Sequence, residues 1–303
     1  MNLVTRSDFD GLACATVLKE AGVIETWSFV HPKDLQDGIV KVTENDVLTN
    51  VPYVNGCGMW FDHHSSEKER IKDIEYKGES RMEKSAARIV YQYYGGKEKM
   101  PHFAEMIDAV DTVDSGELGM DDILNPEGWV LLGFLMDPRT GLGRFREFRI
   151  SNYALMEKLI EDCRTKNIDE ILEDFDVKER VEKYREQDGL FREMVSAHSK
   201  VFSNAIVTDL RDVFPIYTGN RFLIYAMHPK QNISLWIVDG KNKQNVSIAV
   251  GHSILNRTSK TDVGSLLLKY GGGGHKQVGT CQVPYDDCDA TLAELLGKIN
   301  ADG

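Results

Sequence analysis

Three short stretches of the sequence combine carboxylate and imidazole side chains at spacings that could bind a metal ion. The first pairs two aspartates around one residue, the second is an Asp-His-His triplet, and the third spaces aspartates three residues apart, on one face of a helix. Carboxylate oxygens are the ligands that a hard divalent cation such as Mn²⁺ or Mg²⁺ prefers, and histidine is the commonest metal ligand. The residues are Asp8 and Asp10 before Gly11, Asp62-His63-His64, and Asp108, Asp111 and Asp114 before Ser115.

Each stretch alone also has a simpler structural interpretation. An aspartate before Gly11 can cap a helix, an Asp-His-His triplet can lie in a solvated turn, and spaced acids can form a solvated helix face. Neighbouring histidines on an extended segment point in different directions, so at most one of His63 and His64 is expected to join Asp62 on a given ion. The prediction of a site therefore rests on the triplet in combination with two other stretches, near residue 8 and near residue 273.

Other segments carry groups that suit a phosphate. Four consecutive glycines precede His275, and backbone N–H groups can close on an anion where no side chain intervenes. Arg257 would be a second phosphate clamp, and Arg139 lies in a glycine-rich basic loop. Ser85 could cap a helix whose N-terminus faces an anion. A linker, a surface turn and ordinary capping are the alternatives. The glycines expected to contact substrate are Gly272, Gly273 and Gly274.

The segments around these residues alternate between strand and helix patterns. Short apolar runs that end in polar residues indicate buried strands whose carboxyl ends open into a crevice, which is where ligands bind in open α/β sheets. The alternation predicts an α/β fold with an N-terminal doubly wound, mainly parallel sheet. Strands are expected over 2–5, 26–30, 46–51 and 59–61, and helices over 12–21 and 85–94.

A long charged segment predicts a helical connection from residue 152 to about residue 198. Beyond it, strands are expected over 205–207, 222–225, 234–238 and 246–250, and a helix over 262–270. These patterns indicate a smaller C-terminal α/β domain that carries the glycine-rich loop. We predict two domains, residues 1–200 with the metal site and the helical connection, and residues 201–303 for substrate binding.

Composition and charge narrow the class of protein. The chain has 303 residues, of which 42% are hydrophobic and 28% charged, as in ordinary globular proteins. Neither a membrane span nor a signal peptide is expected. The net charge of −12 argues against a broad basic surface for long duplex nucleic acid, but it leaves room for a small anion. Five scattered cysteines predict reduced thiols and a cytoplasmic location. The sequence is compatible with a homodimer.

Taken in order, the motifs of the chain resemble those of the DHH phosphoesterase superfamily, in the branch with a C-terminal DHH-associated domain. That branch includes nanoRNases, oligoribonuclease-like enzymes and exopolyphosphatase-related proteins. The resemblance covers nearly the whole chain, and the combination of motifs is specific. It implies a two-domain clamp, in which the first domain holds Mn²⁺ or similar ions and the second binds the rest of the substrate. The motifs are Asp8-x-Asp10-Gly11, Asp62-His63-His64, Asp114-Ser115 and Gly271 to His275.

The resemblance also implies roles for single residues. Asp10, His63 and Asp114 would bind one ion, with Asn50 adding its carbonyl oxygen, and Asp111 is the alternative to Asp114. A second ion would rest on Arg6, Asp8 and Asn50. Asp62 would ligate the metal or orient His63. His64 would contact the scissile phosphate or donate a proton to the leaving group.

The chain departs from the family pattern at two of these positions. Arg6 stands where the family has a histidine, and Asn50 stands where it has an aspartate that bridges two ions. Arginine cannot ligate a cation, and a neutral amide bridges two metals poorly. Our hypothesis is one well-formed metal site, with the Arg6 guanidinium supplying the charge of a second ion. The alternative is a different strand register, in which Asp46 serves as the ligand.

The resemblance and the acidic charge lead to one preferred function. It is a metal-dependent phosphodiesterase that hydrolyses short linear oligonucleotides, above all dinucleotides such as pGpG, to mononucleotides. One alternative is a phosphatase or exopolyphosphatase that acts on adenosine bisphosphate or polyphosphate. The other is a non-catalytic nucleotide sensor with a degraded metal site. We prefer the enzyme because a pure binding module has little reason to keep all of the acids and histidines together.

Overall fold

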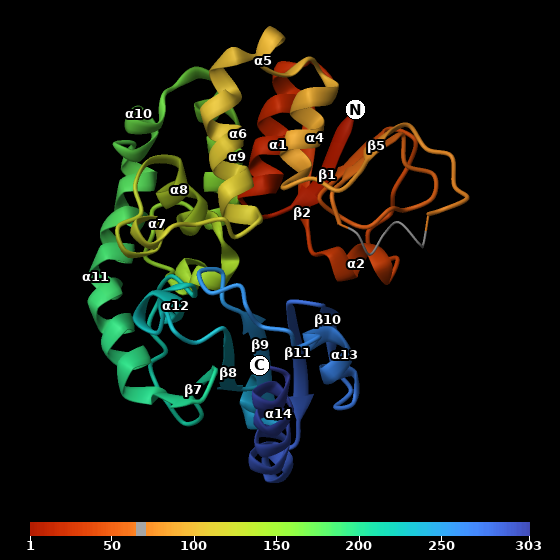
Figure 1. Cartoon of the computed structure of the whole chain (residues 1–303). Coiled ribbons are helices and arrows are strands. Elements are labelled where there is room, and N and C mark those ends of the chain that lie inside the picture. The colour runs from red at the N-terminus through yellow and green to blue at the C-terminus, as the bar shows by residue number, and fades with distance from the viewer. Residues whose placement is uncertain (65–70) are drawn as a thin grey trace. The chain divides into compact units, whose positions relative to one another are not determined.

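The computed structural model describes residues 1–64 and 71–303, which form two compact units (Figure 1). Unit 1 comprises Met1–Glu117 and Pro126–Tyr184, and unit 2 comprises Leu118–Asn125 and Arg185–Gly303. The long helix α11 (Phe175–His198) belongs in part to each unit. The domain division at residues 200 and 201 stays a prediction.

The sheet of unit 1 is parallel throughout its described strands, in the order β2-β1-β3-β4-β5. This order changes direction beside β1, which is the kind of position where open α/β sheets bind ligands. The register aligns Thr5 of β1 with Thr49 of β3, and Thr49 with Phe61 of β4. The carboxyl ends of these strands therefore meet at one edge. The strands are β1 (Asn2–Arg6), β2 (Thr26–Val30), β3 (Asp46–Thr49), β4 (Met59–Asp62) and β5 (Gly78–Ser80).

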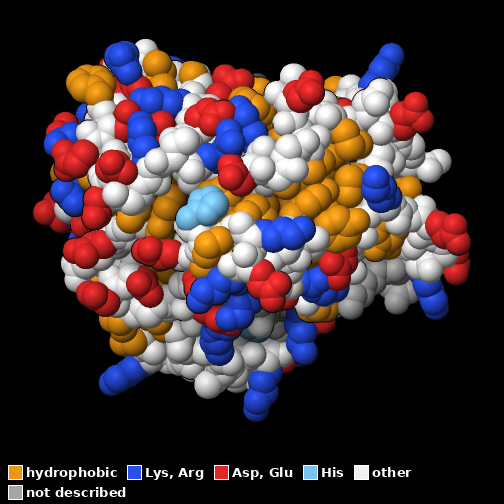
Figure 2. All heavy atoms as spheres, turned by 90° about the horizontal axis from the view of Figure 1, so that it is seen from above, with side chains coloured by type: hydrophobic (Ala, Val, Ile, Leu, Met, Phe, Trp, Pro, Cys, Tyr) orange, Lys and Arg blue, Asp and Glu red, His pale blue; other side chains and the backbone are white. Residues whose placement is uncertain are grey.

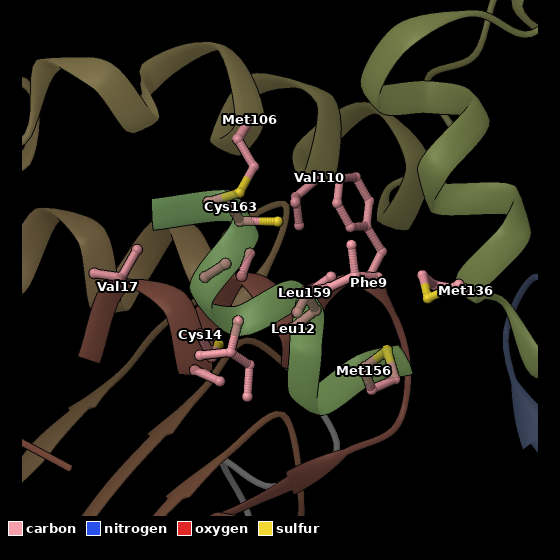
Figure 3. Packing of buried hydrophobic residues seen from close by; sticks show 14 of the residues in the cluster. Phe9, Leu12, Cys14, Val17, Met106, Val110, Met136, Met156, Leu159 and Cys163 are labelled. Atoms are coloured by element: carbon pink, nitrogen blue, oxygen red, sulfur yellow. The ribbon is translucent and has the colours of Figure 1, made fainter. Parts of the chain in front are cut away.

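Helix α1 (Phe9–Glu20) is buried along most of its length, from Phe9 to Leu18. Its apolar residues pack against other helices of the unit, as the side chains of Figure 3 show. They meet Met106 and Val110 of α6 (Ala104–Asp114), and Leu159 of α9 (Asn152–Thr165). Because α1 is held from several directions, the polar residues at its N-terminus have a rigid support.

The remaining helices of unit 1 are α2 (Pro32–Gln36), α4 (Ala86–Tyr93), α5 (Gly96–Lys99), α8 (Gly128–Met136) and α10 (Ile168–Leu172), with 3₁₀ turns at Pro101–Phe103, Pro138–Thr140 and Leu142–Arg144. Of these helices, α4 packs against α1 and the sheet and α8 packs against α1, whereas α5 and α10 pack on other helices (Figure 1). The predicted connection over 152–198 thus consists of α9, α10 and α11.

Unit 2 contains a mixed sheet in the order β10-β11-β9-β8-β7-β6, where only β7 and β8 run parallel among the described pairs. The strands are β6 (Ser199–Phe202), β7 (Ala205–Asp209), β8 (Ile233–Asp239), β9 (Val246–His252), β10 (Gly273–His275) and β11 (Val278–Val283). The helices are α7 (Met120–Leu124), α12 (Leu223–Met227), α13 (Val263–Leu268) and α14 (Cys288–Asp302), with 3₁₀ turns at Lys241–Lys243 and Tyr285–Asp287.

One prediction for unit 2 was wrong in its local structure. The strand predicted over 222–225 is helical and belongs to α12, because a run of four apolar residues fits a buried helix as well as a strand. The Tyr225 hydroxyl fixes this helix against the sheet, 2.9 Å from Ser234 Oγ and 3.1 Å from the carbonyl oxygen of Gly251. The glycine-rich loop is in part the edge strand β10, which pairs with β11.

The surface agrees with the charge balance of the sequence. On the face shown in Figure 2, described Lys and Arg side chains are interspersed with Asp and Glu and do not gather into one basic field. Among the described residues, none of the helices has the length and apolar character needed to cross a bilayer.

Candidate metal centre

Three elements of unit 1 bring one candidate metal ligand each to the same point. Asp10 lies in the first turn of α1, His63 follows the end of β4, and Asp114 is the last residue of α6. One ligand atom from each of the three residues lies within 4.8 Å of the others. These residues come from stretches far apart in the sequence, so it is the sheet and the helices packed on it that create the group.

The hydrogen bonds of His63 leave one ring nitrogen directed at the two acids. Its Nδ1 atom lies 3.2 Å from the carbonyl oxygen of Glu83, which can only accept a hydrogen bond. If Nδ1 carries the proton, the lone pair of Nε2 faces Asp114 Oδ2 at 3.3 Å and Asp10 Oδ2 at 3.9 Å. Nε2 is buried and has no hydrogen-bond partner among the described residues. A nitrogen lone pair beside two carboxylates calls for a cation, so the group fits a divalent metal ion.

The carboxylate of Asp10 is buried at the N-terminus of α4. It accepts hydrogen bonds from the backbone N–H groups of Ala86, at 3.0 Å, and Ala87, at 2.7 Å. Burial, together with the charges of Asp114 and Asp8, nevertheless raises the pKa of Asp10 well above its ordinary value. The pKa of Asp114 is also raised by burial and by Asp8, although His63, when protonated, opposes the shift. Neighbouring carboxyl groups that resist ionisation together are stabilised by a cation between them.

Asp8 has its own partners within unit 1 and stands apart from this group. Its Oδ1 atom caps α1 by accepting from Gly11 N at 2.9 Å, and also accepts from Asn50 Nδ2 at 3.1 Å. Its Oδ2 atom forms an ion pair with Arg6 Nε at 3.0 Å. Gly11 is required here because a Cβ atom would lie 1.9 Å from the carbonyl oxygen of Arg6. The guanidinium of Arg6 and the amide of Asn50 thus contact Asp8, which was expected to bind a second ion.

Asp46 does not replace Asn50. Asp46 begins β3, whereas Asn50 follows the end of that strand, so the two residues lie at opposite ends of it. Asp46 accepts hydrogen bonds from Asn2 Nδ2 at 2.8 Å and from Thr43 N at 2.7 Å. The alternative register considered from the sequence was therefore wrong.

Asp62 orients His64, and not His63 as one interpretation of the sequence had it. Asp62 is fully buried, and its Oδ1 atom lies 2.8 Å from Nδ1 of His64. Burial acts to lower the pKa of His64, but the hydrogen bond and charge of Asp62 and the charge of Asp114 outweigh it, so this pKa is raised. His64 therefore holds a proton more tightly than a free imidazole does.

Asp111 and Asp114, the two candidate ligands of α6, have different partners. Asp111 points to α4, where its Oδ1 accepts from Ser85 Oγ at 2.6 Å and its Oδ2 from Arg88 Nε at 2.7 Å. Asp114, three residues later, is the acid beside His63. Ser85 is fully buried and its Oγ also accepts from Arg88 N at 3.0 Å. The hydroxyl is occupied as a helix cap and the anion at this helix N-terminus is Asp10, and contact of Ser85 with substrate stays a prediction.

Arg139 lies close enough to the group for its charge to act on it. Its Nε atom donates to Asp137 Oδ1 at 2.8 Å, while half of its side chain stays exposed. Burial acts to lower the pKa of Arg139, but the charges of Asp137, Asp8 and Asp114 raise it overall. The contact of Arg139 with substrate stays a prediction.

Comparison with solved structures identifies the family. The pGpG-specific phosphodiesterase PggH from Vibrio cholerae is 49% identical to this chain and has a TM-score of 0.87, and the match covers 100% of this chain and 99% of that one. A protein described as a DHH domain shares the fold at 12% identity, with a TM-score of 0.61 over 99% of this chain and 86% of that one. The chain belongs to the DHH phosphoesterase family. The motifs of the sequence had predicted this membership, and it is confirmed.

Other comparisons add less to the DHH assignment. An exopolyphosphatase-related protein from Bacteroides fragilis is 12% identical, with a TM-score of 0.54 over 99% of this chain and 92% of that one, and shows the fold alone. No family model matches the chain, and no curated protein matches it.

The C-terminal residues that we expect to bind substrate, Arg257 and the glycines with His275, lie in unit 2. His275 is exposed at the end of β10, and Arg257 donates through Nε to the carbonyl oxygen of Ile254 at 3.0 Å. The glycines before His275 serve the packing of this unit in part. A Cβ atom on Gly272 would lie 2.4 Å from the carbonyl oxygen of Thr280, and one on Gly274 would lie 2.2 Å from that of Val278. The clamp of two domains around a substrate stays a prediction.

Sequence analysis predicted Ser85 as a helix cap, but it missed the contacts with the candidate site that are made by the segment from Glu83 to Arg88. It supplies the carbonyl oxygen for His63, the two amides for Asp10 and the cation for Asp111. Three of these contacts are made by the backbone, which leaves no signature in residue types. Arg88 was detectable only as a basic residue in a helix that faces a row of acids.

Proposed function

We propose that this DHH protein is a metal-dependent phosphodiesterase that hydrolyses pGpG to mononucleotides. The observation that carries the proposal is the 49% identity, over 100% of the chain, to a pGpG-specific phosphodiesterase. The group of Asp10, His63 and Asp114 supports the metal dependence. The acidic net charge of −12 also suits a short anionic substrate better than a long polymer.

The bound ion would be Mn²⁺ or Mg²⁺, held by Asp10, His63 and Asp114. As a Lewis acid it would polarise the phosphoryl group and lower the pKa of a water molecule. The Arg6 guanidinium adds positive charge where the phosphoryl oxygens become more negative. Hydrolysis forms a bond from the water oxygen to phosphorus and breaks the bond to the leaving nucleoside oxygen, which takes up a proton. His64 is the proton donor that we assign, because Asp62 orients its ring and raises its pKa.

The test uses the purified full chain, stripped of metal with a chelator. It is incubated with pGpG with and without added Mn²⁺, and the products are separated by chromatography. We expect two GMP molecules from each pGpG, and turnover only after Mn²⁺ is restored. Adenosine bisphosphate, polyphosphate and a longer oligonucleotide complete the panel. Binding of pGpG without products would indicate a sensor, and faster release of phosphate from adenosine bisphosphate would indicate a phosphatase. Either result would overturn the proposal.

Gly273 is the position at which substrate contact can be tested without disturbing the fold. Gly271 and Gly274 have φ values of +71° and +153°, and Gly272 has no room for a Cβ atom. On Gly273 the added atom would meet only Leu268 Cδ2, at 4.0 Å. Packing therefore does not explain why residue 273 is a glycine. The absence of a side chain there supports a close approach of the substrate to the backbone.

We expect Gly273→Ala to keep the Tm of the wild type and to raise the KM for pGpG about tenfold, which corresponds to about 1.4 kcal/mol of binding. Gly297→Ala is the matched control, since Gly297 lies in α14 with nothing within 4 Å of the added atom. An unchanged KM in Gly273→Ala would remove this residue from the substrate site.

The five cysteines are free thiols in the structure. A reducing compartment suits such thiols, so the cytoplasm is the location that we propose for this activity.

A further inference from the structure

One short segment of unit 1, Glu83 to Arg88, contacts two of the three candidate ligands directly and is linked to the helix that carries the third. Its first residue accepts from His63 Nδ1 at 3.2 Å through a carbonyl oxygen and so selects the ring nitrogen that faces the acids. The amides of Ala86 and Ala87 hold both oxygens of Asp10. The third ligand, Asp114, belongs to α6, and this segment reaches α6 through Asp111.

Asp111 joins the two helices that carry or hold the ligands. It lies in α6 one turn before Asp114, and only 9% of its side chain is exposed. One oxygen accepts from Ser85 Oγ at 2.6 Å, and the other accepts from Arg88 Nε at 2.7 Å. Ser85 in turn caps α4 by accepting from the N–H group of Arg88 at 3.0 Å. The hydroxyl that fixes the start of α4 is thus itself fixed by an acid of α6.

We propose that Asp111 is a positioning residue for the metal centre, which holds the N-terminus of α4 on Asp10 and keeps Asp114 opposite it. If the bonds to Ser85 and Arg88 are lost, the first turn of α4 and the end of α6 can move apart. The three ligand atoms then lose their spacing before any ligand is changed. Partners of this kind behind metal ligands commonly alter metal affinity by about 10–100-fold when they are removed.

The chain offers a matched control on the same helix. Asp108 also binds Arg88, through Nη2, but 71% of its side chain is exposed and it has no bond to Ser85. An exposed ion pair of this type contributes little. Asp108→Asn therefore removes the same charge from α6 without disturbing the cap of α4.

The experiment measures the Kd for Mn²⁺ of the full chain by isothermal titration calorimetry. We expect Asp111→Asn and Ser85→Ala to weaken Mn²⁺ binding by about tenfold or more, and Asp108→Asn to change it less than twofold. Because both substitutions break one connection, the double variant should bind Mn²⁺ about as well as the weaker single variant. Hydrolysis of pGpG by the variants should recover when Mn²⁺ is raised above the new Kd.

Two outcomes would overturn the inference. One is a wild-type Kd in Asp111→Asn and Ser85→Ala together with a lowered Tm, which would indicate a structural role only. The other is equal weakening in Asp108→Asn, which would point to the general charge of α6. If Asp111→Asn fails to fold, Ser85→Ala decides. The inference rests on the proposed function, but the two can fail separately. A wild type that binds Mn²⁺ without hydrolysing pGpG would refute the function alone, because the Kd values of the variants and the wild type would still test the role of Asp111.

Discussion

Asp114→Asn is expected to lower the turnover of pGpG by about 10³-fold, equivalent to about 4 kcal/mol of transition-state stabilisation, and to abolish tight binding of Mn²⁺. Asp114 is one of three residues whose ligand atoms lie together, and it adds a negative charge next to His63 Nε2. An amide oxygen at this position would be a weaker ligand for a hard cation. The measurements are the rate of GMP formation and the Kd for Mn²⁺.

The same substitution should stabilise the metal-free fold, although it weakens metal binding and activity. Asp10 and Asp114 both have a raised pKa. A carboxyl group with a raised folded-state pKa binds a proton more tightly in the folded chain, so the free energy of unfolding falls as pH rises from the ordinary carboxyl pKa through the raised one. Asp114→Asn removes one of the two charges. We expect its metal-free Tm at pH 7 to exceed that of the wild type by roughly 2–4 °C for each kcal/mol of relief.

Mn²⁺ should reverse this order of stabilities. At about 100 times its Kd, the ion adds about 2.7 kcal/mol to the free energy of unfolding of the wild type, but little to that of Asp114→Asn. Asp108→Asn, on the exposed side of α6, should behave as the wild type in all three measurements. A lower Tm in metal-free Asp114→Asn, with unchanged Mn²⁺ affinity, would show that Asp114 stabilises the fold and binds no metal.

The sequence was most informative where strands end. Apolar runs predicted β1, β3 and β4, and parallel strands in register place their carboxyl ends at one edge. That geometry was enough to predict that Asp10 and His63 would meet. It could not separate Asp111 from Asp114, because both acids follow the same helical spacing. Their roles differ only through Ser85 and Arg88, which are brought to α6 by tertiary packing.

Residue types also could not show which groups already have partners. From its residue type Ser85 could bind an anion and Asp8 a cation. In the fold, however, their polar atoms bind other parts of unit 1. The glycine run has the same ambiguity. Gly272 and Gly274 are needed because backbone atoms pass too close for a side chain, whereas Gly273 has no such neighbour. Only the positions of the surrounding atoms separate packing glycines from candidate ligand-binding ones.

The two departures from the family pattern, Arg6 and Asn50, act on the same carboxylate. Arg6 Nε lies 3.0 Å from Asp8 Oδ2, and Asn50 Nδ2 donates to Asp8 Oδ1 at 3.1 Å. A histidine and an aspartate at these positions would offer lone pairs to a cation, whereas the arginine and the amide offer N–H groups to Asp8. The charge that a second ion would bring to Asp8 is thus supplied by the chain, which supports the hypothesis of one metal ion.

Metal counting on the purified protein therefore should give one Mn²⁺ per wild-type chain and two for the double variant Arg6→His/Asn50→Asp. Asn50→Asp alone should lower the Tm, because it places a second carboxylate against Asp8 while Arg6 occupies the space of the ion. Arg6→His alone should lower it as well, since Asp8 loses its cation. Two tightly bound ions in the wild type would refute the hypothesis.

Arg6→Ala isolates the contribution of the guanidinium to the reaction. The side chain is 37% exposed, and only its Nε atom is paired with the described residues, so its other N–H groups can reach a phosphate. We expect kcat for pGpG at saturating Mn²⁺ to fall by about 10²–10³-fold, the usual effect of removing a donor that stabilises transition-state charge. Arg6→Lys should recover part of the loss, because it keeps the charge but not the fork of donors. A kcat within threefold of the wild type in Arg6→Ala would show that Arg6 serves Asp8 alone.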